Sequence, residues 1–356
     1  MAERDVSAPS QQASATRDLG QDRARDPRAI LTRLAGRVGD YFPNLPVPPQ
    51  LEVVGSPLEM DSSVVWQVSV AAGSRRERLA VKVFRAGPRR PYGVEAALHT
   101  QLETLKEAAR VCERSPAFRS PRAFEILPDL NALVMEWVEG QRLLDWLATS
   151  FHASEATARA CGEWLRHFHV LRAAGTGDAE ITTRRHNIET VLAELGPKAL
   201  APAFAERVRA YVAGIGNELV GAAVPVCYSH GDFSASNVLV DREGRVAVLD
   251  ISRGQRPSPV EHDLASFLVS LEAAPLFPQR WSITRGRVAR LQTAFLEAYF
   301  ETRVARSSLL HLLEVFYLLK KLRYYHRHYR KRWLARAWAT RFFARRIEEH
   351  LNWKQA

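Results

Sequence analysis

The sequence lacks any apolar stretch long enough to cross a membrane. A membrane-spanning helix needs about 20 consecutive apolar residues, and polar or charged residues interrupt every apolar run well before that length. The first residues, MAERDVSAPSQQASATRDLG, also lack the apolar core of a secretory signal. We therefore expect a cytoplasmic protein.

Cysteine is scarce. The three cysteines, Cys112, Cys161 and Cys227, are widely spaced and form no CxxC pair. They indicate neither a disulfide framework nor a cysteine zinc site. We expect them to be small buried side chains in a reducing compartment.

Acidic residues are missing from one segment. Between Val315 and Ile347 there are eleven Lys or Arg residues and no Asp or Glu, which equals the net charge of +11 of the whole chain. The remaining residues therefore carry balanced charges, and the basic character belongs to this segment.

Composition and periodicity divide the chain into five segments. Residues 1–26 hold too few large apolar side chains to offset the entropy of ordering, so we expect disorder there. Pro27 is placed as in the first turn of a helix, and PNLPVPPQ follows as a linker. The expected segments are a tail (1–26), a helix with a Pro-rich linker (27–50), a first lobe (51–138), a second lobe (139–310) and a basic aromatic helical segment (311–356).

The two lobes differ in their predicted secondary structure. The first has five strand-like stretches, LEVVG, SVVWQVSV, RLAVKVF, PRAFEIL and ALVMEW, with a helix from Val94 to about Arg110 after the third. The second is helical, and strands return only at VPVCYS, NVLVD and RVAVLD, the last two joined by a turn at 241–244. This order predicts an α+β fold, with a small antiparallel sheet in the first lobe and a mainly helical second lobe.

The strongest chemical signal is the loop His230-Gly231-Asp232-Phe-Ser-Ala-Ser-Asn237, followed by a hairpin that ends at Asp250. Phosphoryl transfer needs a carboxylate that orients and deprotonates the attacking hydroxyl, and oxygen ligands for Mg²⁺. A carboxylate and an amide five residues apart can face one site, as in H-x-D-x-x-x-x-N catalytic loops. Each residue alone would suit an ordinary capped polar loop, but the ordered set favours a kinase site.

The segments HGDFSASN, VLDIS and HDLASFL together resemble the signature of the aminoglycoside phosphotransferase family, small-molecule kinases of the protein-kinase-like superfamily. The resemblance covers about residues 50–270. It implies a bilobal protein-kinase-like fold and the use of ATP and Mg²⁺.

The resemblance also implies roles for individual residues of the second lobe. Asp232 is expected to be the catalytic base, and Asn237 and Asp250 are expected to bind Mg²⁺. Asp263 is expected to brace the loop through backbone hydrogen bonds without taking part in the chemistry. His230 is expected to be structural and not a proton carrier.

Lys82 in LAVKVF occupies the V-A-I-K position, from which an ammonium group reaches the α- and β-phosphates of ATP. A lysine among valines is otherwise typical of a solvated strand face. Its place 150 residues before Asp232, after two strands and ahead of a helix, favours the functional interpretation. Glu95 is expected to pair with Lys82, because the family's acidic residue tends to open that helix; Glu103 is the competitor.

The segment between the lobes is Met135-Glu136-Trp137-Val138-Glu139-Gly140. The family pattern implies that adenine is read by the Glu136 carbonyl and the Val138 amide, with Met135 packed behind the base. The same side chains could also be ordinary core and surface residues.

Two features depart from the kinase pattern. No GxGxxG lies between the first strands; GSPLEMDSS (55–63) takes its place, and its amides and hydroxyls could also cover phosphates. Ile251 and Ser252 replace the Phe-Gly of D-F-G and leave Asp250 intact.

Three features favour a small molecule over a protein as the acceptor. Ser234 stands where protein Ser/Thr kinases carry a basic residue, and Gly231 stands where they carry Arg. Only twelve residues separate Asp250 from Asp263, which leaves no room for a long activation loop.

Residues 309–353 contain no proline or glycine and are predicted to form one or two long helices. Their rings and leucines could pack on the second lobe with the arginines solvated, lie on anionic lipid, or bind an anionic substrate. Nucleic-acid binding is not favoured, since no recognition motif accompanies the charge. The apolar members of this pattern include Leu318, Leu322, Tyr325, Tyr329 and Trp333.

The sequence therefore predicts an ATP- and Mg²⁺-dependent phosphotransferase acting on a hydroxyl of a small molecule, sugar or glycolipid, with peripheral contact at the inner face of the membrane left open. Aminoglycosides are cationic, so the basic C-terminus favours an anionic, glycolipid or phosphorylated acceptor. The alternative is a catalytically inactive, nucleotide-binding scaffold at a membrane surface. The joint presence of Lys82, Asp232, Asn237 and Asp250 argues against that alternative.

Overall fold

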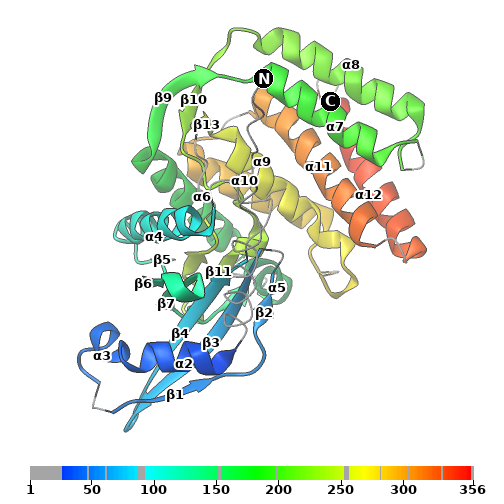
Figure 1. Cartoon of the computed structure of the whole chain (residues 1–356). Coiled ribbons are helices and arrows are strands. Elements are labelled where there is room, and N and C mark those ends of the chain that lie inside the picture. Colours follow the sequence, from blue (N-terminus) through cyan, green and yellow to red (C-terminus); the bar gives the residue numbers. More distant parts are fainter. Residues whose placement is uncertain are drawn as a thin grey trace, which may run out of the picture. The chain divides into compact units, whose positions relative to one another are not determined.

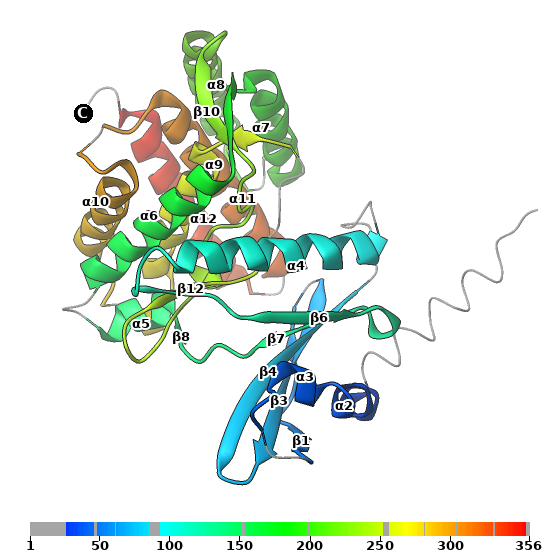
Figure 2. The ribbon, with the colours of Figure 1, turned by 90° about the vertical axis from the view of Figure 1, so that its left-hand side faces the viewer.

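The chain forms two compact units in a computed structural model (Figures 1 and 2). One unit consists of Met1–Ala109 and Ser120–Val138, and the other of Arg110–Arg119 and Glu139–Ala356. The expected disordered tail lies outside the described residues, apart from Asp26. The structure describes residues 26–45, 48–60, 62–85, 93–150, 154–197, 199–251, 256–280, 282–303, 305–329 and 332–353.

The first unit is built on an antiparallel sheet in the order β1-β3-β4-β7-β6, with β2 paired to β3. Its centre is the long β3–β4 hairpin, in which Lys82 lies opposite Val65 of β3 and Leu133 of β7. The strands are β1 (Gln50–Val53), β2 (Leu58–Glu59), β3 (Ser63–Ala72), β4 (Arg75–Phe84), β6 (Ala123–Leu127) and β7 (Ala132–Glu136).

Helices cover both faces of this sheet (Figure 2). Helix α2 (Pro27–Ala35) starts as expected, with the Asp26 carboxylate accepting a hydrogen bond from the Arg28 amide at 2.9 Å. With α3 (Val38–Tyr41) it packs on one face, and α4 (Gly93–Cys112) packs on the other, confirming the predicted helix there. Alternate residues of β4 therefore face opposite helices.

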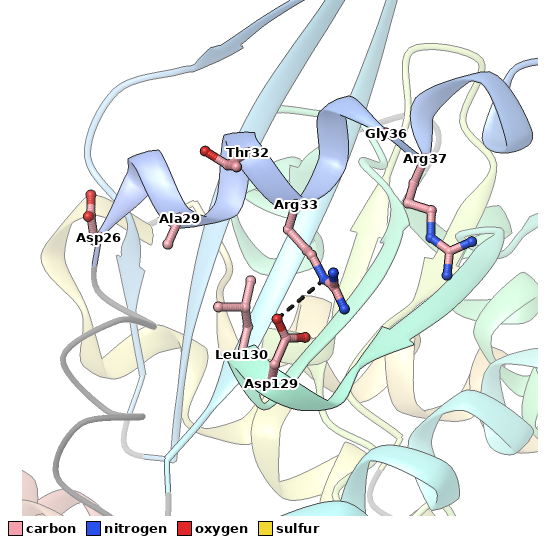
Figure 3. Close-up of a pocket in the computed structure, with 8 residues that line it drawn as sticks. All are labelled: Asp26, Ala29, Thr32, Arg33, Gly36, Arg37, Asp129 and Leu130. Carbon is pink, nitrogen blue, oxygen red and sulfur yellow. Dashed lines mark ion pairs between the residues drawn. The ribbon is translucent and has the colours of Figure 1, made fainter. Parts of the chain in front are cut away.

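A shallow depression lies between α2 and the turn η1 (Pro128–Leu130) of the first unit (Figure 3). Arg33 Nε and Asp129 Oδ2 are 3.3 Å apart across it, and both side chains are about half exposed, so this ion pair contributes little stability. None of the predicted site residues lines it.

The second unit is mainly helical. Helix α9 is almost wholly buried and forms its centre. Helices α6 and α10 cross so closely at Gly162 that a Cβ there would lie 2.2 Å from the Phe295 carbonyl oxygen. The helices are α5 (Leu143–Thr149), α6 (Ser154–Leu171), α7 (Ile181–Leu195), α8 (Pro202–Leu219), α9 (Glu261–Glu272), α10 (Arg285–Phe300), α11 (Ser308–His328) and α12 (Trp333–Leu351), with 3₁₀ turns η2 (Ala235–Asn237), η3 (Ala274–Leu276) and η4 (Pro278–Arg280).

Two small sheets complete the second unit, in the orders β5-β12-β11-β8 and β13-β10-β9. The predicted hairpin is confirmed as β11–β12: the Asp241 carboxylate accepts hydrogen bonds from the Glu243 and Arg245 amides, and Gly244 adopts a positive φ of 80°. The strands are β5 (Phe118–Arg119), β8 (Gln141–Arg142), β9 (Ala173–Asp178), β10 (Ala223–Cys227), β11 (Val238–Val240), β12 (Val246–Val248) and β13 (Ser258–Pro259).

The expectation that strands return only at VPVCYS and the hairpin is wrong. Strand β9 precedes them and pairs antiparallel with β10, with Val224 opposite Gly177. Its sequence, AAGTGD, has small residues and glycines where a strand normally shows alternating large apolar side chains. Strand β9 forms because it hydrogen-bonds with β10, and the local sequence of β9 does not reveal that partner.

The C-terminal segment forms two helices, α11 and α12, which pack against each other. Leu318, Leu322 and Tyr325 are buried on α11, so the packed interpretation holds there. The start of α12 differs, because Trp333 and Trp338 remain 66% and 60% exposed. No helix in the described part of the chain has the length and hydropathy that a membrane span needs.

The cysteines match the expectation for inert side chains. All three are free, Cys161 and Cys227 are buried, and Cys112 is half-buried. Burial raises the pKa of Cys112 to about 11 and that of Cys227 to about 12, so both thiols stay protonated at neutral pH.

Candidate active site

Asp263 of α9 accepts hydrogen bonds from the backbone of the loop between β10 and β11. Asp263 Oδ2 accepts a hydrogen bond from the His230 amide at 2.6 Å, and Oδ1 accepts one from the Gly231 amide at 3.0 Å. Bonds from amides to a buried carboxylate are strong because the acceptor is charged. The expected backbone bracing by Asp263 is confirmed.

Two further residues hold Asp263 itself. His169, near the end of α6, places Nε2 3.0 Å from Asp263 Oδ2 and Nδ1 2.8 Å from the Tyr299 hydroxyl on α10. Burial acts to raise the pKa of Asp263, but the His169 hydrogen bond and the nearby histidines outweigh it and lower that pKa overall. His169 and Tyr299 are not among the residues that the sequence motifs indicate; the available signal was a polar residue on the apolar face of α6.

Aromatic packing fixes the same loop from within. The Phe233 ring is fully buried and lies 5.1 Å from the Phe267 ring and 5.9 Å from the Trp164 ring, centre to centre. Ser270 Oγ accepts a hydrogen bond from the Ala235 amide at 2.9 Å. The loop is therefore attached to α9 at both of its ends.

Asp232 and Asn237 face each other across this loop. Asn237 Nδ2 donates to Asp232 Oδ2 and to the Asp232 carbonyl oxygen, both at 2.9 Å. These bonds commit the amide nitrogen and leave Asn237 Oδ1 as a hard oxygen ligand for a cation. Five residues of loop thus bring the predicted base and a predicted metal ligand together.

The Asp232 carboxylate is reachable from solvent, as a base that meets a substrate must be. The protein around it removes enough water to raise its pKa above the ordinary value, with a smaller push from the Asp250 charge. The Asn237 hydrogen bond and the Lys321 charge act in the opposite direction. A raised pKa makes this carboxylate a better proton acceptor than an ordinary aspartate.

His230 has the features of a structural residue. It is fully buried, and its Nδ1 accepts a hydrogen bond from the Asp232 amide at 3.3 Å. Burial lowers its pKa, so the ring is neutral at physiological pH. The bond orients the backbone of Asp232 and leaves the carboxylate free to act.

Asp250 follows β12 with a left-handed backbone (φ 56°), and the amide of the preceding Leu249 donates to the Asn237 carbonyl oxygen at 2.8 Å. Its charge acts on both Asp232 and His230. The second unit therefore gathers Asp232, Asn237 and Asp250 into one site. Carboxylate and amide oxygens are the ligands that Mg²⁺ prefers.

The first unit carries the residues predicted to bind nucleotide. Lys82 is buried on β4, with Nζ 5.2 Å from the centre of the Phe84 ring. Lys82 and Met135 belong to the sheet face that α4 covers, since Phe84, Leu133 and Met135 share one core with that helix. Glu95 lies in the first turn of α4 with an exposed side chain, and its pairing with Lys82 stays a prediction.

The backbone at the end of β7 and directly after it forms hydrogen bonds with neighbouring segments. The Glu136 amide donates to the Arg122 carbonyl oxygen at 2.8 Å, and the Glu136 carboxylate accepts from the Arg122 amide at 3.2 Å. The Trp137 amide bonds to the Arg78 carbonyl oxygen at 3.0 Å. Within the described residues the buried Val138 amide has no such backbone acceptor, as the predicted adenine contact requires.

Two lysines that the sequence analysis did not single out belong to the same neighbourhood. Lys320 and Lys321 of α11 are largely covered, and α11 packs beside α9 (Figure 1). Burial lowers the pKa of both, while the Asp232 charge opposes that shift. Lys320 Nζ lies 4.8 Å from the centre of the Tyr317 ring. In the sequence they were two of the eleven cations between Val315 and Ile347, and no spacing marked them.

The fold defines the class of protein. The chain superposes on the ethanolamine kinase of Plasmodium vivax with a TM-score of 0.51 at 10% identity, covering 95% of each chain. It also superposes on the complex of APH(2")-IIia with GDP and kanamycin, with a TM-score of 0.50 at 13% identity, covering 90% of this chain and 98% of that one. These likenesses show a kinase-like α+β fold.

Sequence comparison gives the family. The model of the phosphotransferase enzyme family (APH) matches residues 55–312, most of the chain and all of the loop described above. This chain belongs to that family. Comparison with curated proteins yields no match.

Proposed function

We propose that this protein transfers the γ-phosphoryl group of ATP to a hydroxyl of a small-molecule acceptor. The observation that carries the proposal is the pair of hydrogen bonds from Asn237 to Asp232, on a loop that Asp263 holds by two backbone amides. This arrangement presents a fixed carboxylate beside a free amide oxygen. The family membership is consistent with that chemistry.

In the proposed reaction, Asp232 accepts the proton of the acceptor hydroxyl as its oxygen attacks the γ-phosphorus. A P–O bond forms to the acceptor, the bond between the γ-phosphorus and the β,γ-bridging oxygen breaks, and ADP leaves with that oxygen. General-base and orienting roles of this kind contribute about 10²- to 10⁴-fold in rate. The raised pKa of Asp232 suits it to hold the proton until release.

Asn237 and Asp250 would hold Mg²⁺, which when bound neutralises charge on the phosphates. The donor set fits that ion, because Asn237 offers Oδ1 and Asp250 a carboxylate. In the first unit, Lys82 would hold the α- and β-phosphates with Glu95 as its partner. The Glu136 carbonyl and the Val138 amide would read adenine with Met135 behind it.

The test is turnover with purified protein, Mg²⁺ and a panel of hydroxyl-bearing metabolites, with ATP and GTP supplied separately. ADP release and phosphate on the acceptor should appear together, and the Asp232→Asn variant should lose both. Nucleotide binding without transfer to any acceptor would favour the inactive scaffold. Preference for GTP would keep the reaction and correct the nucleotide.

We further propose that the acceptor carries an anionic group bound by Lys320 and Lys321. Arg323 and Arg327, further along α11, are paired with Glu194, whereas neither lysine forms an ion pair with a carboxylate of the described residues. Lys320 contacts the Tyr317 ring, but neither lysine is neutralised by a carboxylate of the described residues, so a bound anion would stabilise these largely covered ammonium groups. The Asp232 charge acts to raise the pKa of both lysines, which supports an anion-binding position close to the proposed base.

This acceptor class is tested by comparing matched substrates with and without a phosphate or carboxylate. Lys321→Ala should raise KM for the anionic acceptor about 10- to 100-fold, the worth of one charge-assisted hydrogen bond. Arg345→Ala, which removes an exposed cation of α12 that pairs with Glu349, is the matched control and should leave KM unchanged. Equal effects on charged and uncharged acceptors would overturn the proposal.

A second role, peripheral contact with anionic lipid, is favoured by one observation. Trp333, Leu334 and Trp338 are exposed together on the first half of α12, next to the exposed Arg332 and Arg341. Exposed tryptophans beside cations are typical of helices at a lipid surface. A glycolipid acceptor would combine both proposals.

A further inference from the structure

A buried cluster of histidine and glutamate lies where α11 meets α12, away from the loop described above. His311 and Glu314 stand three residues apart on α11, so they share one helical face. His350 comes from the last turn of α12. All three side chains are buried, and one ligand atom from each lies within 4.8 Å of the others.

The two distances from Glu314 to the histidines are long for hydrogen bonds and close to the spacing of metal ligands. His311 Nδ1 is 3.5 Å from Glu314 Oε2, and His350 Nδ1 is 3.6 Å from the same oxygen. Hydrogen bonds between N–H and oxygen span about 2.7–3.2 Å. Ligands of a tetrahedral ion with bonds of about 2.0–2.1 Å stand about 3.3–3.4 Å apart.

Two of these ligand atoms have no other partner. His311 Nδ1 and Glu314 Oε2 are buried and make no hydrogen bond within the described structure. Leaving a buried polar atom unsatisfied costs about 1–3 kcal/mol. A cation placed between the three residues would satisfy both atoms at once.

The surroundings resemble the outer shell of a metal site. His350 turns its other nitrogen, Nε2, to Glu272 Oε1 at 3.2 Å, and Arg346 holds that oxygen at 2.6 Å. Arg306 occupies Glu314 Oε1 at 2.7 Å and leaves Oε2 to the cluster. Histidine ligands commonly donate their second N–H to a carboxylate, which fixes the tautomer and the ring orientation.

We propose that His311 Nδ1, Glu314 Oε2 and His350 Nδ1 bind one divalent transition-metal ion of the Zn²⁺ type, which fastens α12 to α11. Two imidazoles and one carboxylate suit Zn²⁺ better than Mg²⁺, which prefers oxygen alone. The fourth position is open to water. A cavity of about 300 Å³ is lined in part by Glu272 and Arg346, and Glu272 is the residue that His350 contacts through Nε2.

The competing occupant is a proton on His350, held between Glu272 and Glu314. That arrangement needs no metal, because Arg306 and Arg346 already balance the two carboxylates. The two occupants predict different responses. A metal gives a stoichiometric ion and stabilisation by added Zn²⁺, and a proton gives neither.

The experiment measures metal in the full-length protein by mass spectrometry and follows thermal unfolding as Zn²⁺ is added after chelation. We expect about one ion per chain, a rise in the unfolding temperature on adding Zn²⁺, and a visible spectrum of tetrahedral Co²⁺ after replacement. His311→Gln should abolish all three. Glu272→Gln should weaken affinity about 10- to 100-fold, as outer-shell changes do.

Two controls separate this site from others. His328→Gln removes an exposed histidine of the same helix and should change nothing. Asp250→Asn should retain the ion, because it alters only the proposed Mg²⁺ site. A wild-type protein that binds no Zn²⁺ or Co²⁺ and gains no stability from them overturns the proposal, even if a variant fails to fold. So does an ion that Asp250→Asn removes and His311→Gln retains.

Discussion

Asp232 and Asp263 are two aspartates of one site whose surroundings push their pKa values in opposite directions. Removal of water dominates at Asp232 and raises its pKa, whereas hydrogen bonding and nearby histidines prevail at Asp263 and lower its pKa. The two pKa shifts suit different roles. A raised pKa makes Asp232 a better proton acceptor, whereas Asp263 must stay ionised to hold the loop by hydrogen bonds. The residue-scale predictions follow from this contrast.

Asp232→Ala should reduce phosphoryl transfer by about 10²- to 10⁴-fold while nucleotide binding persists, because the base is lost and the proposed phosphate ligands remain. Turnover and nucleotide affinity are measured on the same preparation. Asp129→Asn, at a half-exposed surface ion pair, serves as the control and should behave as wild type. Near-normal turnover of Asp232→Ala would remove this residue from the mechanism.

Asp263→Asn should destabilise the protein by about 3–5 kcal/mol at neutral pH, since it removes one partner of a buried charged network. The folded pKa of Asp263 is lower than the unfolded value near 3.8. Its contribution is therefore complete above pH 3.8 and is lost as pH falls through the folded pKa. The difference in unfolding temperature between the two proteins should narrow as the pH falls below 3.8; a difference that stays constant from pH 7 into that range would contradict this.

Helix α11 carries the two proposed acceptor lysines, two of the three proposed ligands of the transition-metal ion and many buried leucines. Lys320 follows His311 by nine residues, about two and a half turns. Leu318 and Leu322 are buried and follow His311 by seven and eleven residues, so they lie on the same face of the helix as His311. A shift of this helix would therefore disturb acceptor binding and stability together.

The elements also show what the sequence could predict. The loop around Asp232 could be predicted from HGDFSASN and the hairpin after it, because its contacts are local. Asn237, for example, binds Asp232 from only five residues away. Strand β9, the His169 support and the His311–His350 cluster depend on pairings more than 30 residues apart. Nothing in the local pattern of AAGTGD or HFHV specifies those partners.

The exposed start of α12 should bind anionic vesicles at low salt. Each Lys or Arg near such a surface contributes about 1 kcal/mol, and the tryptophans add interfacial anchoring. Replacing Trp333 and Trp338 by Ser should reduce co-sedimentation, while replacing the exposed Val170 and Val220 by Ser should not. If the wild-type protein co-sedimented with neither neutral nor anionic vesicles, this patch would have no role in lipid binding.

At the scale of the whole molecule, the proposed nucleotide contacts are divided between two compact units. Lys82 belongs to the first unit and Asp250 to the second. If both residues contact the bound Mg²⁺-nucleotide, each should contribute to its affinity, and the ligand should stabilise the folded chain. A ligand bound only to the folded state stabilises by about 2.7 kcal/mol at one hundred times its Kd.

Saturating ATP with Mg²⁺ should therefore raise the unfolding temperature of the wild type, and the rise should shrink in both Lys82→Ala and Asp250→Asn. The first variant loses a cation at the phosphates, and the second loses a metal ligand; one bound molecule connects the two effects. Lys106→Ala, at an exposed lysine of α4 that pairs with Glu103, is the control and should respond as wild type. Omitting Mg²⁺ should weaken the wild-type response and leave that of Asp250→Asn nearly unchanged. A rise that survives both substitutions would place the nucleotide elsewhere, and a rise lost in only one would confine it to a single unit.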